Sequence, residues 1–300
     1  MLETTEKFKN IYHIHSWLDN CAYIFDEVME YGPLKVDLGQ LKWLTPAGFT
    51  VLLSTLNYLD RFYYLDTIPP KYDSRTDKFD IVGYIERMNF LSSCPEDVKL
   101  SFEKMINMDY YYNRNRNRKE KELDELRISR CDRDIEELER SIKRIMRGKG
   151  LHINRISDIT EIVTELAQNA VEHADEISDA ECYSCVQYYK ETSTQPGRVE
   201  IAISDTGRGI VDSLRDHVDV GSSNDRIVEK AIFTRASRLP EQDRGKGFNN
   251  VRRTAFGWSS DAEFYVRTHD SMYRIYENRL ELLDKGRYFP GTFYYIIINV

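Results

Sequence analysis

The segment Asp158–Ala174 reads DITEIVTELAQNAVEHA and decides the fold of the second half of the chain. Its apolar residues recur at helical spacing, and one narrow sector of the predicted helix holds Ile159, Val163, Leu166 and Ala170. We therefore predict a helix over residues 156–174 that buries this sector. Asp158 is expected to cap the helix, and Glu161 to complete a capping box.

A second stripe of the same helix is polar and consists of Glu165, Asn169 and His173. A carboxylate and a carboxamide one turn apart can point into the same cleft. Carboxamide oxygen is a hard ligand that suits Mg²⁺, and a carboxylate can take a proton from water or a hydroxyl. For this helix alone, a solvated polar face is the simpler interpretation.

Three further segments place glycine at the ends of predicted elements. Residues 198–204, RVEIAIS, alternate as a strand and lead into DTGRGI at 205–210. Glycines after a strand let the backbone approach a flat ligand closely. The run RGKGF at 244–248 precedes a predicted helix over 249–255, and glycines at a helix start offer free amides to phosphate. Gly291-Thr292 opens the last predicted strand.

These four segments, in this order, resemble the signature of the GHKL ATPases, which include gyrase, MutL, the large heat-shock chaperones and histidine kinases. ELAQNAVEHA is similar to the N box, DTGRGI to the G1 box and GKGF to the G2 box. Gly291-Thr292 is similar to the final threonine on the adenine side. The resemblance implies an α/β sandwich in which helices cover one face of a mixed sheet.

The resemblance also implies a site for ATP with Mg²⁺. Asn169 would hold the metal that bridges the phosphates, and Glu165 is the candidate general base. Asp205 would accept a hydrogen bond from the exocyclic amine of adenine, with support from Thr292. Gly207 and Gly209 would leave room for the base. The triphosphate would be lined by Gly245, Lys246 and Gly247.

Two segments near the glycine boxes modify these expectations. Residues 211–244 would form the lid, a segment that moves with nucleotide state. Many histidine kinases have a longer Gly-x-Gly-Leu-Gly run, whereas this chain has the bulky Phe248 and Asn249 after the second glycine. ATP binding is still expected, but the geometry of the phosphate loop and the turnover rate are left open.

The first 112 residues alternate between strand and helix patterns, which predicts a small separate α/β domain. The expected elements are a strand over 8–15, a helix over 17–30, a strand over 65–70 and a helix over 81–91. Residues 113–127 are expected to be a charged linker, and residues 128–300 the GHKL domain.

Within the first part, VDLGQLKWLTPAGFTVLL at 36–53 resembles the central strand-turn-helix of STAS domains, which regulate bacterial sigma-factor switches and some transporters. The turn of those domains carries a phosphorylated serine, and the matching positions here are Thr45, Pro46, Ala47 and Gly48. Because Pro46 replaces the serine, the usual phosphorylation switch is expected to be absent. Any small α/β domain is the alternative.

An apolar stripe follows the predicted linker: Ile128, Cys131, Ile135, Leu138, Ile142 and Ile145. This face either packs into the domain core or forms a homodimer seam over residues 128–145. The basic run NRNRNRK at 113–119 is interpreted as a solvated linker. The net charge of −8 opposes general nucleic-acid binding.

Composition excludes several other classes of protein. The chain has 300 residues, of which 41% are hydrophobic and 31% charged, which predicts a soluble, globular protein of two domains. The sequence lacks an apolar run of membrane-spanning length and a signal-peptide core, so a cytoplasmic location is expected. Its five cysteines fit reduced thiols, and a metal at the CxxC of Cys182 and Cys185 is disfavoured.

The positions of histidine narrow the expected subfamily. A histidine autokinase needs a phosphoacceptor histidine on a helix ahead of the ATP domain, and no histidine lies on the predicted helix before Gly148. The arrangement resembles the serine-kinase anti-sigma proteins. We expect an ATP-dependent regulatory switch that controls a protein partner, with slow hydrolysis or Ser/Thr phosphotransfer. The alternative is a non-enzymatic module in which ATP only stabilises a protein-binding surface.

Overall fold

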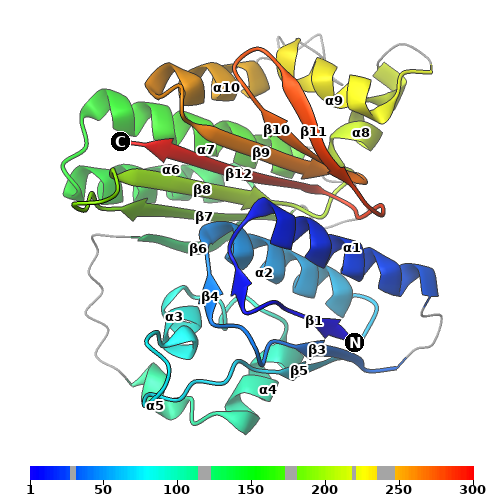
Figure 1. The fold of residues 1–300 in the computed structure, drawn as a ribbon, viewed down its shortest axis with the longest axis vertical. Coiled ribbons are helices and arrows are strands. Elements are labelled where there is room, and N and C mark those ends of the chain that lie inside the picture. Colours follow the sequence, from blue (N-terminus) through cyan, green and yellow to red (C-terminus); the bar gives the residue numbers. More distant parts are fainter. Residues whose placement is uncertain (28–31, 114–122, 173–180, 218–220, 235–246) are drawn as a thin grey trace.

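The computed structural model describes residues 1–27, 32–113, 123–172, 181–217, 221–234 and 247–300. The chain is arranged in layers, with helices on one face of a large sheet and the N-terminal helices on its other face (Figure 1). A smaller sheet lies beyond those N-terminal helices (Figure 1). The predicted α/β fold class is confirmed.

The large sheet has seven strands among the described residues, in the order β11-β10-β9-β12-β8-β7-β6. Its strands are β6 (Leu123–Ser129), β7 (Cys182–Tyr189), β8 (Arg198–Ser204), β9 (Glu263–Thr268), β10 (Ser271–Ile275), β11 (Leu280–Lys285) and β12 (Thr292–Asn299). All its pairings are antiparallel, which corrects the mixed sheet predicted from the sequence. Side chains alternate between the two faces, so Tyr294 contacts one core and its neighbour Tyr295 the other.

The helical layer covers one face of this sheet. Its helices are α6 (Asp132–Gly148), α7 (Ile153–Glu172), α8 (Gly209–Leu214), α9 (Asn224–Phe233) and α10 (Gly247–Trp258), with a short 3₁₀ turn η1 (Arg215–His217) after α8. Helix α7 packs between α6 and α10. The predicted apolar stripe of α6, including Ile135, Leu138 and Ile142, is buried in this layer. These side chains pack within the chain, which agrees with the core-packing interpretation of the stripe.

Helix α7 begins earlier than predicted, at Ile153, so Asp158 lies inside the helix and does not cap it. The Asp158 carboxylate instead accepts a hydrogen bond from Trp258 Nε1 of α10 at 2.5 Å. The Arg155 guanidinium stacks over the same indole, 4.0 Å from the ring centroid. The capping prediction was wrong because a tertiary contact to α10 uses this aspartate.

The N-terminal unit, residues 1–112, combines short parallel strands with five helices among its described residues. The elements are β1 (Leu2–Glu3), β2 (Lys7–Phe8), α1 (Ile11–Glu27), β3 (Leu34–Asp37), β4 (Trp43–Leu44), α2 (Pro46–Asp60), β5 (Leu65–Ile68), α3 (Ile81–Arg87), α4 (Glu96–Met105) and α5 (Asp109–Tyr112). Strands β1, β3 and β5 form one parallel sheet, and β2 pairs with β4. The strand predicted over 8–15 is wrong, because α1 already begins at Ile11.

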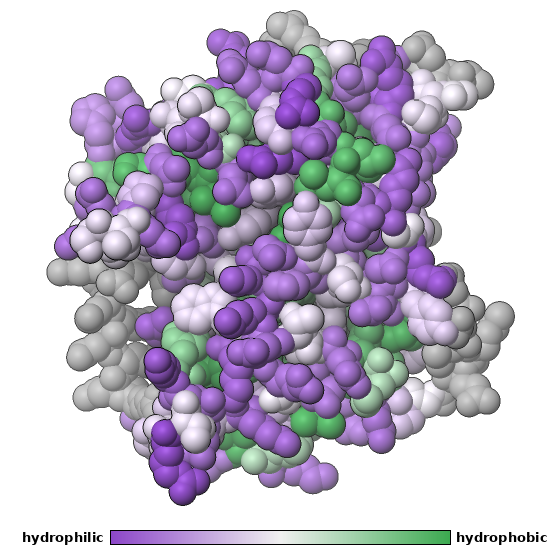
Figure 2. All heavy atoms as spheres, viewed as in Figure 1, coloured by the Kyte–Doolittle hydropathy of each residue, from purple (hydrophilic) through white to green (hydrophobic). Residues whose placement is uncertain are grey.

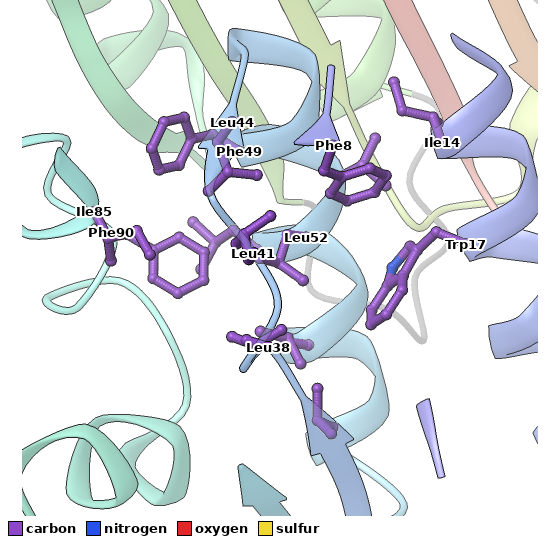
Figure 3. Close-up of a cluster of buried hydrophobic side chains, with 14 of the residues drawn as sticks. Phe8, Ile14, Trp17, Leu38, Leu41, Leu44, Phe49, Leu52, Ile85 and Phe90 are labelled. Carbon is purple, nitrogen blue, oxygen red and sulfur yellow. The ribbon is translucent and has the colours of Figure 1, made fainter. Parts of the chain in front are cut away.

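Helix α2 is the central element between the two sheets. Thr45 is its N-cap, and the Thr45 hydroxyl accepts a hydrogen bond from Gly48 N at 3.4 Å, as the threonine–proline pattern predicts. Most of the helix is buried, since α2 packs against β7 and β8 of the large sheet and against α1. The core around it contains Phe8, Trp17, Phe49 and Phe90 (Figure 3). A helix that is apolar all round is expected in such a position.

This arrangement joins the two predicted domains through one core. The N-terminal core cluster also includes Tyr183, Ala202, Phe293 and Tyr295 from the large sheet. On the face of the molecule that Figure 2 shows, hydrophobic residues form only small separate patches. The GHKL-like part therefore has both faces of its sheet covered, not one as predicted.

The predicted linker over 113–127 overlaps the large sheet, because residues 123–127 belong to β6. Leu126 N of this strand donates a hydrogen bond to Met88 O of the N-terminal unit at 3.2 Å. Most of the basic run at 113–119 lies outside the described residues. The junction between the units is thus made in part by an edge strand.

Candidate functional site

One end of the site is built around Asp205, which follows the last residue of β8 and is buried. Asp205 N donates a hydrogen bond to Thr292 O at 3.0 Å, and Asp205 Oδ1 accepts one from Gly207 N at 2.9 Å. Burial raises the pKa of Asp205 to about 7, while the hydrogen bonds from the backbone of Gly207 and Thr292 act against this rise. A carboxylate held in this way can accept a hydrogen bond from a ligand.

Two glycines allow three backbone segments to meet beside Asp205. Gly209 begins α8 with a φ of +70°, and a methyl group there would lie 2.8 Å from Gly291 O. Gly291 has a φ of +91°, and a methyl group on it would lie 1.9 Å from Asp205 O. Side chains at either position would clash with backbone and adopt a disfavoured conformation. We call this cluster, with Asp205 and Thr292, the base end of the site.

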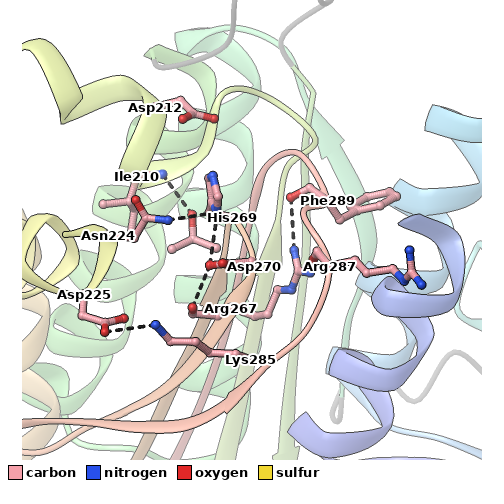
Figure 4. Close-up of polar contacts among 12 residues, drawn as sticks. Ile210, Asp212, Asn224, Asp225, Arg267, His269, Asp270, Lys285, Arg287 and Phe289 are labelled. Atoms are coloured by element: carbon pink, nitrogen blue, oxygen red, sulfur yellow. Dashed lines mark hydrogen bonds and ion pairs between the residues drawn. The ribbon is translucent and has the colours of Figure 1, made fainter. Parts of the chain in front are cut away.

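The loop that leads to Gly291 is anchored by a buried arginine. Arg267 of β9 donates hydrogen bonds to Phe289 O at 3.1 Å and to Arg287 O at 2.7 Å (Figure 4). Burial lowers the pKa of Arg267 to about 10, so its guanidinium remains charged at neutral pH. The next residue, Thr268, accepts a hydrogen bond from Ile210 N at 3.0 Å. Arg267 and Thr268 support the base end, and nothing in their local sequence indicated it.

An aromatic residue forms part of the same region. Tyr294 is buried and lies two residues after Thr292, on the same face of β12. The Phe248 ring of α10 lies 5.8 Å from the Tyr294 ring, centroid to centroid. Phe248 therefore packs towards the sheet at the start of α10. Strand alternation could have placed Tyr294 beside the predicted Thr292.

The second end of the site brings together α7 and the start of α10, and we call it the phosphate end. A methyl group on Gly247 would lie 2.5 Å from Glu165 Oε2 and 3.6 Å from Asn169 Nδ2. The carboxylate and the amide thus face the first residue of α10, as the stripe on the predicted helix required. A methyl group at Gly247 would require the Glu165 carboxylate to move.

The electrostatics of the phosphate end differ from those of a solvated face. Burial raises the pKa of Glu165, and the neighbouring Glu161 and Glu172 raise it further. Asn169 Nδ2 is buried and has no hydrogen-bond partner in the described part of the chain. Buried polar atoms are nearly always satisfied, so the unpaired Nδ2, which is a hydrogen-bond donor, points to a missing acceptor such as a phosphate oxygen. The solvated interpretation of this stripe is therefore disfavoured.

Several predicted site residues cannot be located. Gly245, Lys246 and His173 lie outside the described residues, as do 218–220 and 235–244 of the predicted lid. Cys182 and Cys185 are free thiols that belong to different cores, on opposite faces of β7. Within the described ranges, no group of three or more His, Cys, Asp or Glu side chains could hold a metal ion.

Comparison with known protein families agrees with this geometry. Residues 154–275 match the family described as histidine kinase-, DNA gyrase B-, and HSP90-like ATPase. This part of the chain is a GHKL-type ATPase domain. No curated protein matches the chain. The matched range of the GHKL domain ends before Gly291 and Thr292, which the fold brings to Asp205.

GHKL ATPase domains bind ATP, so the match indicates an ATP site in this part of the chain. The residues present also fit ATP with Mg²⁺: a buried carboxylate at the base end, and an unpaired amide and a glycine cradle at the phosphate end. None of the described helices is both long and apolar enough to cross a membrane.

Proposed function

We propose that the chain is an ATP-dependent regulatory switch that uses slow ATP hydrolysis, or phosphotransfer to Ser or Thr, to control a protein partner. The observation that carries the proposal is the meeting of Glu165 and Asn169 at Gly247. A protein that only binds nucleotide needs the base contact and the phosphate amides. A carboxylate of raised pKa beside the phosphates is needed only for proton transfer.

Each residue has a role in this proposal. Asp205 and Thr292 would orient the adenine, with Gly207 and Gly209 giving it room. Asn169 would hold Mg²⁺, which neutralises charge on the phosphates when bound. Gly245, Lys246 and Gly247 would line the triphosphate.

Glu165 would act as general base in the chemical step. Its carboxylate would take the proton from a water molecule or from a partner's hydroxyl, and the freed oxygen would attack the γ-phosphorus as the bond to ADP breaks. The products are ADP with phosphate, or ADP with a phosphorylated partner. Raised basicity of Glu165 favours this proton transfer.

The N-terminal unit is proposed to be the regulatory part, in keeping with its STAS-like sequence. Thr45 does not serve as a phosphorylation site in this proposal. It is buried, and its hydroxyl is engaged in the cap of α2, where it accepts a hydrogen bond from Gly48 N. Control would therefore come through contact with a partner and not through the serine-type switch of STAS domains.

The test is incubation with γ-labelled ATP, with and without Mg²⁺, alone and with a cell lysate. We expect Mg²⁺-dependent label in free phosphate or on a second protein, and its loss in Asn169→Ala. Gln168→Ala, an exposed change on the same helix, is the matched control. ATP binding without release or transfer under every condition would favour the non-enzymatic, ATP-stabilised binding module instead.

A further inference from the structure

The residue immediately before Asp205 connects the base end to the N-terminal unit. Ser204 ends β8, and its Cα lies opposite Tyr183 of β7 and Phe293 of β12. Both neighbours belong to the core that faces α2, and Ser204 is fully buried there. Consecutive residues of a strand point to opposite faces, so Ser204 faces α2 while Asp205 faces the nucleotide side.

The Ser204 hydroxyl is bound to α2 alone among its described contacts. Ser204 Oγ donates a hydrogen bond to Thr50 O at 3.0 Å and lies 3.2 Å from Ser54 Oγ. Thr50, Ser54 and Ser204 are all buried. A hydroxyl in an otherwise apolar interface requires such partners, because burial without them is costly. This contact therefore fixes the end of β8 relative to α2.

Helix α2 is itself held firmly within the N-terminal unit. Thr55 Oγ1 accepts a hydrogen bond from Trp17 Nε1 of α1 at 2.9 Å. A methyl group on Gly48 would lie 2.4 Å from Phe8 O, so α2 also packs directly on the backbone at β2. Any displacement of α2 along its axis would move the acceptors of the Ser204 hydroxyl.

We propose that Ser204 is a positioning residue. Through its hydrogen bond to Ser204, helix α2 of the N-terminal unit would set the position of the Asp205 carboxylate, which contacts the adenine amine. The peptide between these residues is tied on the other side by the bond from Asp205 N to Thr292 O, 3.0 Å long. The carboxylate is thus held between α2 and β12. The inference rests on the proposed function and adds a route by which the N-terminal unit regulates the nucleotide site.

The test compares affinities for ATP and inosine triphosphate, measured by titration calorimetry with Mg²⁺ in the full chain. Inosine triphosphate has the same phosphates and lacks the exocyclic amine, so the ratio of the two affinities reports on Asp205. In Ser204→Ala we expect ATP to bind roughly three- to tenfold more weakly, in the range of mutations that couple distant sites. Inosine triphosphate should change less than about twofold by the same argument.

Ser184→Ala is the matched control. Ser184 is a buried serine on the neighbouring strand β7, and its hydroxyl has no hydrogen-bond partner among the described residues. This variant should leave the ratio unchanged. Ser54→Ala keeps the bond from Ser204 to Thr50 O, so it should lower the ratio less than Ser204→Ala does. It also provides a second variant if Ser204→Ala folds poorly.

The outcomes separate the inference from the proposed function. A parent that does not prefer ATP over inosine triphosphate overturns the base contact of Asp205, and this inference with it. A parent with that preference, and a Ser204→Ala variant with an unchanged ratio, overturns the positioning role alone. Equal weakening of both nucleotides would mean a purely structural role and also overturn it.

Discussion

The base end and the phosphate end of the site are built differently. At the base end, Asp205 is fixed by backbone hydrogen bonds, and Gly291 lies in direct contact with its carbonyl. At the phosphate end, Glu165 and Asn169 rely on their side chains, and the Asn169 amide lacks a partner within the described residues. The backbone of the base end is paired within the chain, whereas the phosphate end has one buried donor, Asn169 Nδ2, without an acceptor among the described residues.

This difference assigns recognition of the base to the base end and the chemical step to the phosphate end. Backbone hydrogen bonds hold Asp205, so the position of the carboxylate that would contact the base is set by the sheet. Side chains of α7 can be exchanged without disturbing the core, because Ile159, Val163 and Leu166 bury the opposite stripe. Changes at the base end should therefore affect affinity and stability, and changes at the phosphate end should affect turnover.

The largest effect is expected at the phosphate end, from Glu165→Gln. Loss of a positioned general base should lower the rate of phosphate release or transfer roughly 10²–10⁴-fold. ATP affinity should stay close to that of the parent, since Glu165 is not expected to hold base, ribose or metal. Single-turnover release of the γ-phosphate, measured beside affinity, checks this. Equal rates in the two proteins would place the base elsewhere.

At the base end, Asp205→Asn should weaken ATP binding strongly. The adenine amine loses a charge-assisted acceptor worth about 1.5–3 kcal/mol, which is roughly a 10- to 150-fold change in affinity. Calorimetric titration with ATP measures this loss. Asp212→Asn, a half-exposed aspartate of α8, is the control and should bind as the parent does. Unchanged affinity in Asp205→Asn would contradict the base contact.

Gly291→Ala tests whether the base end is preformed. Its φ is +91°, and an added methyl carbon would lie only 1.9 Å from Asp205 O, so there is no room for it. The free energy of unfolding should fall by at least about 1–3 kcal/mol, the usual cost of such backbone strain. Thermal or urea unfolding measures it. Gly257→Ala is the control, because Gly257 lies in α10 with open space around it, so this change should be neutral or stabilising.

The smallest effect is a pH dependence at the base end. Because the pKa of Asp205 is raised to about 7, the folded chain holds a proton that the unfolded chain releases near its ordinary pKa of about 4. The contribution of Asp205 to stability therefore declines as pH rises from about 4 to about 7. Urea unfolding of parent and Asp205→Asn across this range should show a steeper decline in the parent, because the raised pKa of Glu165 contributes equally to both proteins.

ATP binding should respond to the same proton in the opposite sense. The ionised carboxylate is the stronger acceptor for the amine, so affinity should rise towards pH 7 and then level off. The loss at pH 6 is expected to be up to about tenfold. Ionisation of ATP itself is common to parent and Asp205→Asn, so the ratio of their affinities isolates Asp205. A ratio independent of pH would contradict the raised pKa.

The sequence predicted the residues of the site better than the long-range contacts that hold them in place. Glu165 and Asn169 could be placed because helical periodicity is local, and Asp205 because a strand pattern ends there. Arg267 and Ser204 could not, since their roles depend on Phe289 O and on Thr50 O, which are distant in the chain. Long-range contacts of this kind leave no periodic pattern.

The same limit explains the errors in the fold. The Asp158 cap and the strand over 8–15 were local inferences that tertiary contacts overrode. We did not predict that both faces of the large sheet are covered, because we assigned the apolar surface of α2 to the core of the N-terminal unit alone. A helix that is apolar on all sides, as α2 is between Pro46 and Thr55, indicates two buried faces and could have revealed the joint core.

The most direct test of the account is a crystal structure of the full chain with Mg²⁺ and a non-hydrolysable ATP analogue. The account predicts the adenine amine within hydrogen-bond distance of the Asp205 carboxylate, at about 2.7–3.2 Å. It also predicts Mg²⁺ on the Asn169 side-chain oxygen at about 2.0–2.1 Å, with Glu165 beside the γ-phosphate. An adenine bound away from Asp205, or a metal ion held without Asn169, would contradict it.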